Sequence, residues 1–279
     1  MKKLLFNFIF LALSFATIES NQTLTQRAQA VITRVKHLFI TAPVQAPQLA
    51  TIRVGYVAIK DTIVDYTNYY PSIKKFADNP SIDCILLDIN SGGGSASVAQ
   101  IIAELINKIK EIKPVIVFIS GTACSAAYWI TAAASHSIAT SLAEVGSIGV
   151  AWQAVQDQNF LKTYIVSGKY KVPYTNTGEL IDDEIKAHIQ KEIDRDAEEF
   201  FSFVATARAI PFNTVKDFQA KVFSGRTAAE LGLIDEVGAL DAVIKKITKD
   251  IEDKNGSSYH TIELINSDNV VISTFDTIR

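Results

Sequence analysis

Short apolar runs rich in β-branched residues alternate along the chain with longer segments whose apolar residues recur at helical spacing. The short runs at residues 52–59, 84–89 and 115–119 predict strands. The run at 84–89 is continuous, as expected for a strand buried on both faces. Helical spacing predicts helices at residues 98–109 and 182–209, the second with acidic residues in its first turn. This alternation predicts an α/β domain.

Further elements follow from the same patterns. We expect a helix at 66–76 that Pro71 interrupts, and a helix that follows a strand-turn near Gly238. The last part of the chain contains two strand-like runs whose place in the sheet the pattern does not indicate. The helix after Gly238 is expected at 240–251, and the two strand-like runs lie at 260–265 and 270–274. We also expect strands at 137–140 and 163–166.

The N-terminus has the pattern of an export signal. Lys2 and Lys3 precede an apolar run at residues 4–18, which is shorter than the roughly 20 residues of a comfortable membrane span. An uncleaved anchor and a removed signal peptide both fit, and a buried helix of a cytosolic protein is the third reading. In the first two readings the two lysines keep the start of the chain on the cytoplasmic side, so the body is exported.

The predicted domain organisation has four parts. Residues 1–20 form the signal peptide or membrane anchor, 21–50 a helix and a Pro-containing linker, 51–252 the main domain and 253–279 a C-terminal tail. The whole chain has 27 basic and 30 acidic residues and no block of basic residues, so nucleic acid is not an expected partner. Cys84 and Cys124 lie in apolar or small-residue contexts and predict buried thiols without a disulfide. No metal-ligand spacing exists, and we expect no metal or organic cofactor.

Ser125 lies where a nucleophile is expected. The strand at 115–119 is followed by small residues and then by a helix-forming run at 126–134. A serine at such a strand-turn-helix junction exposes its hydroxyl beside backbone N–H groups that stabilise an oxyanion. On this stretch alone, a helix N-cap at Ser120, Thr122 or Ser125 is the more common reading. Cys124 is a rival nucleophile that ranks below Ser125, because no neighbour would ionise its thiol.

Three small-residue turns follow successive apolar runs: after Ile89, after Ile119 and around residues 146–149. In an open α/β sheet, such turns gather at the carboxyl ends of the strands. The glycines at 92–94 lack a P-loop lysine and form no GxGxxG, which disfavours nucleotide binding. Gly94 could instead supply an N–H beside that of Ala126 as an oxyanion hole.

A serine hydroxyl needs a base, and the histidines offer a poor one. His37, His188 and His260 lie in segments far from the turn in sequence, and His136 would lie at the far end of the helix that follows Ser125. A lysine can act as the base if burial lowers its pKa from about 10.4 toward neutrality, since desolvation disfavours the ammonium form. Lys169 and Lys171 are the candidates, and either could instead be a solvated loop lysine.

Several stretches over roughly residues 50–250 match a known family in their order. Ile89–Ser95 is similar to I-N-S-P-G-G-S, 123–129 to A-A-S-G-G-Y-Y, and 146–150 to G-S-I-G-V. Residues 167–171 match S-G-x-x-K, and 223–235 match T-G-x-x-A followed by G-L-V-D. The chain therefore resembles the signal peptide peptidase A or protease IV family, the S49 serine peptidases of the ClpP/crotonase superfamily.

The resemblance implies a ClpP/crotonase-like fold of repeated ββα units. It also implies Ser125 as nucleophile, Lys171 as general base, and the N–H groups of Gly94 and Ala126 as the oxyanion hole. Lys169 does not align with the base, and residues 148–150 lack the histidine of ClpP-type relatives. Gly92 stands where the family has proline, and Ala126-Ala127 where it has Gly-Gly. The sequence around Ser125 is also similar to that of phage capsid-maturation peptidases.

What the resemblance implies for function is a serine endopeptidase with a Ser/Lys dyad that cleaves residual signal peptides or short apolar polypeptides at the membrane. Residues 4–18 would attach it to the bacterial inner membrane, with the catalytic domain on the periplasmic or extracytoplasmic side. Secretion after signal cleavage is the alternative. A homo-oligomer is implied, so serine and lysine would pair within one copy or between neighbours, and the helix from Asp182 is our candidate for subunit contact. A crotonase-type acyl-CoA enzyme and a catalytically silent scaffold remain open.

Overall fold

The computed structural model describes residues 50–156, 161–167, 183–256 and 258–277. Chain contacts divide the protein into residues 1–48 and 49–279, and the described residues all belong to the second unit. The expected signal or anchor segment, and the helix and linker up to residue 49, lie outside the described residues. Within the described ranges, no helix combines the length and the apolar character that crossing a membrane requires.

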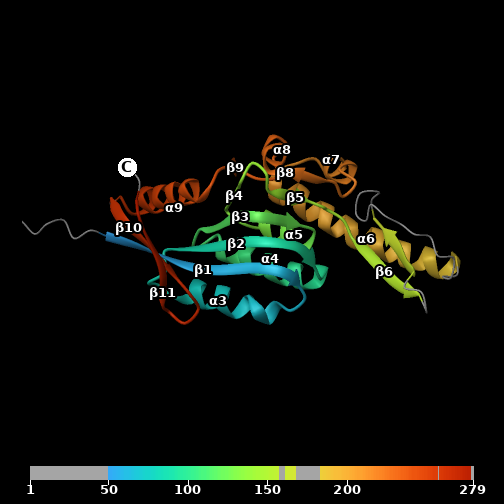
Figure 1. Cartoon of the computed structure of the whole chain (residues 1–279), viewed down its shortest axis with the longest axis horizontal. Coiled ribbons are helices and arrows are strands. Elements are labelled where there is room, and N and C mark those ends of the chain that lie inside the picture. Colours follow the sequence, from blue (N-terminus) through green and yellow to red (C-terminus); the bar gives the residue numbers. More distant parts are fainter. Residues whose placement is uncertain (1–49, 157–160, 168–182, 257, 278–279) are drawn as a thin grey trace, which may run out of the picture. The chain divides into compact units, whose positions relative to one another are not determined.

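The second unit is built on a mostly parallel sheet in the order β11-β10-β1-β2-β3-β4-β9 (Figure 1). Every neighbouring pair in this order is parallel except β10 and β11. The strands are β1 Ala50–Ile63, β2 Cys84–Gly94, β3 Val115–Cys124, β4 His136–Ala139, β9 Glu236–Val237, β10 Tyr259–Ile265 and β11 Val271–Asp276.

Two small additions complete the strands. The end of β3 pairs with β5 (Glu144–Gly146), which pairs in turn with β8 (Val222–Ser224). Separately, β6 (Ala151–Gln156) pairs antiparallel with β7 (Leu161–Val166). The helices are η1 Tyr66–Asn68, α3 Tyr70–Asp78, α4 Ala96–Ile109, α5 Ala126–Ala132, α6 Asp183–Arg208, α7 Phe212–Asp217, α8 Gly225–Glu230 and α9 Leu240–Asn255.

Helices cover both faces of the sheet, and β2 shows why. Its side chains alternate between two cores: Ile85, Leu87 and Ile89 join one, while Cys84 and Leu86 join the other. The first core takes its helical side chains from α3, α4, α5, α6, α7 and α8, and the second from α9. Figure 1 shows α3 and α9 on opposite sides of the sheet. The predicted α/β class and the strand buried on both faces are therefore confirmed.

The structure corrects one predicted helix. Pro71 does not interrupt a helix at 66–76 but lies in the first turn of α3, after the separate turn η1. Proline is tolerated there because the first helical N–H groups have no intrahelical partner. The long helix predicted at 182–209 is confirmed as α6. The tail strands find their place beyond β1, where β10 pairs parallel with β1 and β11 antiparallel with β10.

Candidate active site

Ser125 lies at the junction of β3 and α5 in a backbone conformation that is rare for a residue with a side chain. Its φ is 55° and its ψ is −125°. Such a conformation costs about 1–3 kcal/mol, and it persists only where surrounding contacts impose it. Here the Ser125 N–H donates to the carbonyl oxygen of Gly146 (2.9 Å), and the Trp129 N–H donates to the carbonyl of Ser125 (3.0 Å). In α/β-hydrolases, a sharp strand-to-helix turn of this kind presents the nucleophile.

The N-cap interpretation of this region is not supported. The Ser125 side chain makes no capping hydrogen bond to α5, although the residue occupies the N-cap position. Ser120 and Thr122 lie inside β3 rather than at a helix end. The Thr122 hydroxyl donates to Glu144 (3.3 Å) on the neighbouring strand. The geometry at residue 125 therefore has another origin than helix capping.

The glycines at the end of β2 lie against this turn. A Cβ on Gly93 would lie 2.7 Å from the Cβ of Ser125 and 2.7 Å from the carbonyl oxygen of Cys124. Gly93 also has a φ of 112°, which side chains rarely permit. A Cβ on Gly94 would lie 2.1 Å from the carbonyl oxygen of Ile63. Glycine is required at both positions, because β2 passes between the serine turn and β1 without room for a methyl group.

A pocket of about 270 Å³ opens beside Ser125, and we call it the serine pocket. It brings together the three described residues that the sequence selected, Gly94, Ser125 and Ala126. Its wall consists of Gly94, Ser95, Ala96, Ser125, Ala126, Trp129, Gly149, Val150, Ala151 and Phe200. Ala126 is the first residue of α5, where N–H groups have no intrahelical acceptor. The pocket thus combines a half-buried hydroxyl, two backbone segments suited to an oxyanion, and apolar walls.

The two candidate bases, Lys169 and Lys171, lie outside the described residues. The chain can be followed as far as Ser167, which begins the S-G-x-x-K stretch. The Ser167 N–H donates to the carbonyl of Val150 (3.0 Å), and the Val150 N–H donates to the Ser167 hydroxyl (2.7 Å). Since Val150 lines the serine pocket, the stretch that leads to both lysines starts beside it.

Both cysteines are buried and neither forms a disulfide, as the sequence predicted. Cys124, the rival nucleophile, is 6% exposed, and its thiol faces the carbonyl oxygen of Glu144 (3.8 Å). Burial raises the pKa of the Cys84 thiol well above its ordinary value. Neither thiol lines the serine pocket.

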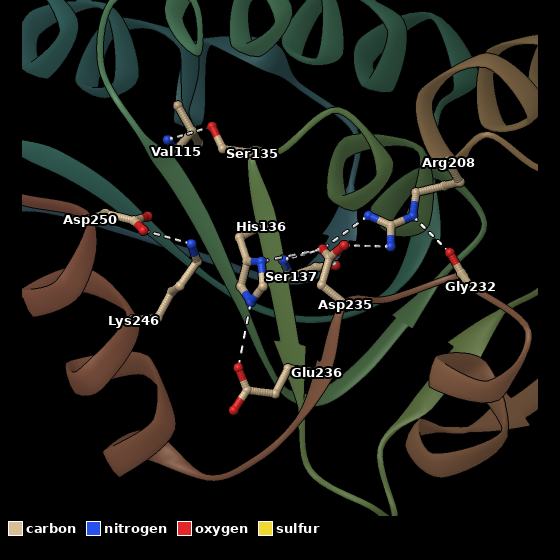
Figure 2. Close-up of polar contacts among 10 residues, drawn as sticks. All are labelled: Val115, Ser135, His136, Ser137, Arg208, Gly232, Asp235, Glu236, Lys246 and Asp250. Carbon is tan, nitrogen blue, oxygen red and sulfur yellow. Dashed lines mark hydrogen bonds and ion pairs between the residues drawn. The ribbon is translucent and has the colours of Figure 1, made fainter. Parts of the chain in front are cut away.

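His136 lies at the opposite end of the strands from Ser125, as predicted. It is level with Ile116 in the pairing of β3 and β4, nine residues before Ser125, which is roughly 30 Å along an extended strand. Its Nδ1 lies 3.9 Å from Asp235 and its Nε2 lies 3.6 Å from Glu236 (Figure 2). His188 is exposed on α6, whereas His37 lies outside the described residues. The part of the chain that the structure describes has no group of three or more His, Cys, Asp or Glu arranged for a metal ion.

Asp235 is the centre of this second polar cluster. Its carboxylate accepts from the N–H and the hydroxyl of Ser137 (2.8 Å each) and from both terminal nitrogens of Arg208 (2.9 and 3.0 Å), as Figure 2 shows. Burial alone would raise the pKa of Asp235. The hydrogen bonds and charge of Arg208, with those of Ser137, outweigh that effect and hold its pKa below the ordinary value.

The sequence did not reveal two parts of the site. One is the contact between Gly93 and Ser125, which a run of three glycines does not distinguish from a contact through Gly94. The other is Phe200, which lies 75 residues after Ser125 in the sequence. Helix α6 brings it to the serine pocket, where its ring stacks on that of Trp129 with centroids 4.4 Å apart. Phe200 was recognised only as one member of the apolar stripe of its helix.

Two family models match the chain. The model of peptidase family S49 matches residues 107–253, which is just over half of the chain. A model described as CoA-ligase matches residues 20–145, which is less than half. The S49 match includes Ser125 and the stretches around 146–150, 167–171 and 223–235.

Individual relatives point the same way. The chain is 31% identical, over 65% of its length, to a protein of Methanocaldococcus jannaschii that carries a provisional protease name, and it covers 60% of that protein. It is 31% identical over 64% of its length to capsid assembly protease C of Escherichia phage lambda, and covers 42% of it. It is 29% identical over 72% of its length to protease 4 of Haemophilus influenzae, and covers 34% of it. The chain thus spans less than two thirds of the length of each.

Among solved structures, a mutant of a membrane-bound stomatin-specific protease aligns with a TM-score of 0.49 and 16% identity. The alignment covers 72% of this chain and 86% of that one.

Proposed function

The chain belongs to peptidase family S49, and from this premise we propose that it is a serine endopeptidase in which Ser125 is the nucleophile and Lys171 the general base. The observation that carries the proposal is the backbone of Ser125. It is held in a rare conformation at a strand-to-helix turn and lines a pocket together with Gly94 and Ala126. Strain of this kind concentrates at functional sites.

The proposed reaction has two stages. Neutral Lys171 takes the proton of the Ser125 hydroxyl, and the oxygen attacks a peptide carbonyl. The N–H groups of Gly94 and Ala126 donate to the oxyanion of the tetrahedral intermediate. The intermediate collapses as the protonated lysine gives its proton to the leaving amine, which leaves an acyl group on Ser125. Water, deprotonated by the same lysine, then hydrolyses this ester and restores the hydroxyl.

The described chain supports Lys171 through its neighbour Ser167. The two hydrogen bonds between Ser167 and Val150 anchor the start of the motif beside the serine pocket. Lys171 follows four residues later, and four residues span at most about 14 Å. This length permits Lys171 to approach the serine pocket, which is what the proposed role requires.

The proposed substrates are residual signal peptides or short apolar polypeptides. The apolar wall of the serine pocket, formed by Ala96, Val150 and Phe200 among others, supports an apolar residue near the cleaved bond. We further propose attachment to the bacterial inner membrane through residues 4–18, with the catalytic domain on the extracytoplasmic side. Homo-oligomer formation through α6 completes the proposal, with secretion after signal cleavage as the alternative to attachment.

Peptide cleavage by four forms of the protein tests this mechanism. Wild type and Lys169→Ala should cleave a quenched apolar peptide, whereas Ser125→Ala and Lys171→Ala should be inactive while keeping their circular dichroism and melting temperature. A loss of the same size in both lysine variants would contradict the choice of base. Mixing the two inactive variants separates the pairing modes, because activity returns only if Ser125 and Lys171 pair between subunits.

The second candidate is a crotonase-type acyl-CoA enzyme; the match of residues 20–145 to a CoA-ligase model also concerns CoA but indicates a different reaction type. Such an enzyme can use the same oxyanion hole without a serine nucleophile. A serine-directed acylating probe discriminates between the two. Labelling of wild type that Ser125→Ala abolishes supports the peptidase, whereas acyl-CoA turnover that survives Ser125→Ala supports the alternative. A protein that neither is labelled nor turns over either substrate would be the silent scaffold.

A further inference from the structure

Trp129 separates two hollows of the molecule. One is the serine pocket, of about 270 Å³. The other is a groove of about 410 Å³ between α4 and α6, which we call the outer groove. Of the described residues that line these hollows, Trp129 alone belongs to both. The outer groove consists of Gln100, Glu104, Trp129, Arg195, Glu198, Glu199, Ser202 and Phe203.

The indole is held in place from both sides. Trp129 is 4% exposed, and its ring stacks on Phe200 with centroids 4.4 Å apart and planes 8° apart. On the groove side Phe203 approaches it at 5.8 Å and 43°. Trp129 also lies one helical turn after Ser125, and its backbone N–H donates to the carbonyl oxygen of Ser125. The position of the ring is therefore tied to the position of the nucleophile.

The two hollows differ in polarity. The serine pocket is lined by the small or polar residues Gly94, Ser95 and Ser125 and by apolar residues that include Ala96, Val150 and Phe200. The outer groove has exposed charged residues from α4 and α6. The serine pocket lies below the roughly 300–1,000 Å³ of sites for drug-sized ligands. Because part of this volume must hold the peptide backbone at the scissile bond, the rest is suited to a single side chain.

We propose that Trp129, supported by Phe200, forms a wall that limits the size of the serine pocket and restricts the residue beside the scissile bond to an aliphatic side chain. This inference rests on the proposed function and specifies its substrates. A large aromatic side chain would have to displace a packed ring from the core, which cores resist. Aliphatic side chains up to the size of leucine fit without that movement.

The test measures kcat/KM of the full-length protein on matched pairs of peptides. The two peptides of a pair differ in one residue beside the scissile bond, which is leucine or tryptophan, and one pair is made for each side of that bond. Wild type should show a kcat/KM at least about tenfold higher for leucine, within the 10- to 200-fold range of a hydrophobic pocket. Trp129→Leu should reduce this preference at least about tenfold, by joining the pocket to the groove. Among the described residues, the indole Nε1 has no hydrogen-bond partner, so this variant removes volume without breaking a bond seen in the structure.

The matched control is Phe203→Leu, because Phe203 touches the same indole but lines only the outer groove. It should leave the preference within about twofold of wild type, as expected for a residue outside the pocket. If Trp129→Leu does not fold, Trp129→Phe should shift the preference in the same direction by a smaller factor. An unchanged preference in a folded Trp129 variant, or an equal shift in Phe203→Leu, would overturn the inference.

A binding measurement separates this inference from the proposed reaction. The chain has two tryptophans, so in Ser125→Ala with Trp152→Phe the indole of Trp129 is the sole fluorescent tryptophan. Leucine peptides should bind without cleavage and change its emission, and tryptophan-free phenylalanine peptides should bind at least about tenfold more weakly. Binding seen by calorimetry without a change in emission would refute the role of Trp129 even in an active peptidase. Selective binding by a protein that cleaves nothing would refute the reaction and leave the pocket intact, and the absence of any binding would refute both.

Discussion

Two serines of this molecule lie beside very different chemistry. Ser125 ends β3 in a strained turn beside a pocket. Ser137 lies in β4 with His136 and Asp235 at the other end of the strands, a set that has the residue types of a Ser-His-Asp triad (Figure 2). The set with the familiar residue types is the one whose geometry opposes catalysis.

The hydrogen bonds explain the difference. Ser137 is fully buried, and its hydroxyl donates directly to Asp235, whose carboxylate is also bound by Arg208. In a working triad the serine would donate to histidine and the histidine to the carboxylate. His136 instead faces two carboxylates at 3.6 and 3.9 Å. The hydrogen bonds of Asp235 to Ser137 and Arg208 join β4 to α6, and they commit the Ser137 hydroxyl to a carboxylate instead of a histidine.

The largest effect that would sharpen this comparison concerns the two hydroxyls. Ser125→Ala should lower kcat for peptide cleavage by at least about 10³-fold, because the nucleophile is lost. Ser137→Ala should change kcat less than twofold and lower the free energy of unfolding by about 1 kcal/mol, since one buried hydrogen bond is removed. Steady-state kinetics and urea unfolding of both variants measure this. Comparable kinetic losses would break the comparison.

The next effect concerns the glycines that approach Ser125. Gly93→Ala should cost about 10²-fold in kcat and about 1–3 kcal/mol of stability, because the new Cβ would lie 2.7 Å from the Cβ of Ser125. Gly92→Ala is the control, since a Cβ there meets nothing within 4 Å. It should retain activity within about threefold of wild type. Equal activity in the two variants would show that the turn tolerates displacement.

A smaller effect, confined to stability, is expected at Asp235. Asp235→Asn should cost about 1–3 kcal/mol without changing kcat, because Arg208 would lose a charged partner. The folded-state pKa of Asp235 is below its ordinary value of 3.8. Its contribution to stability is therefore full above that value and lost as the pH falls through the folded pKa.

Urea unfolding of wild type and Asp235→Asn from neutral pH to about pH 2.5 measures the difference between them. The gap in unfolding free energy should narrow as the pH falls below 3.8. A gap that stays constant over this range would show that the carboxylate charge is not what stabilises the cluster.

The smallest effect is expected at His136. His136→Gln should change kcat less than twofold and the free energy of unfolding by no more than about 1 kcal/mol, because the ring lies near its carboxylate partners without a short hydrogen bond to either. The same kinetic and unfolding measurements apply. A loss of activity comparable to that of Ser125→Ala would place catalysis at the end of the sheet that holds His136 and would contradict the role of Ser125.

Local patterns explain what could be predicted. Apolar runs and helical spacing identified β2, β3 and α6, because burial imposes those periods on any strand or helix of this kind. The composition around Ser125 predicted a strand, a turn of small residues and a helix. It identified the nucleophile candidate because such a junction exposes a hydroxyl beside backbone N–H groups. Lys171 remains a prediction, since it lies outside the described residues.

The amino-acid sequence by itself determined the α/β class, the strands of the central sheet and the position of Ser125 between a strand and a helix. Only the tertiary structure decided that Gly93 touches Ser125, that Phe200 stacks on Trp129 beside it, and that Ser137, His136 and Asp235 form a cluster with Arg208. The physical reason is range. Periodicity and turn composition act between neighbours along the chain, whereas these contacts join residues that only the packing of helices on a completed sheet brings together.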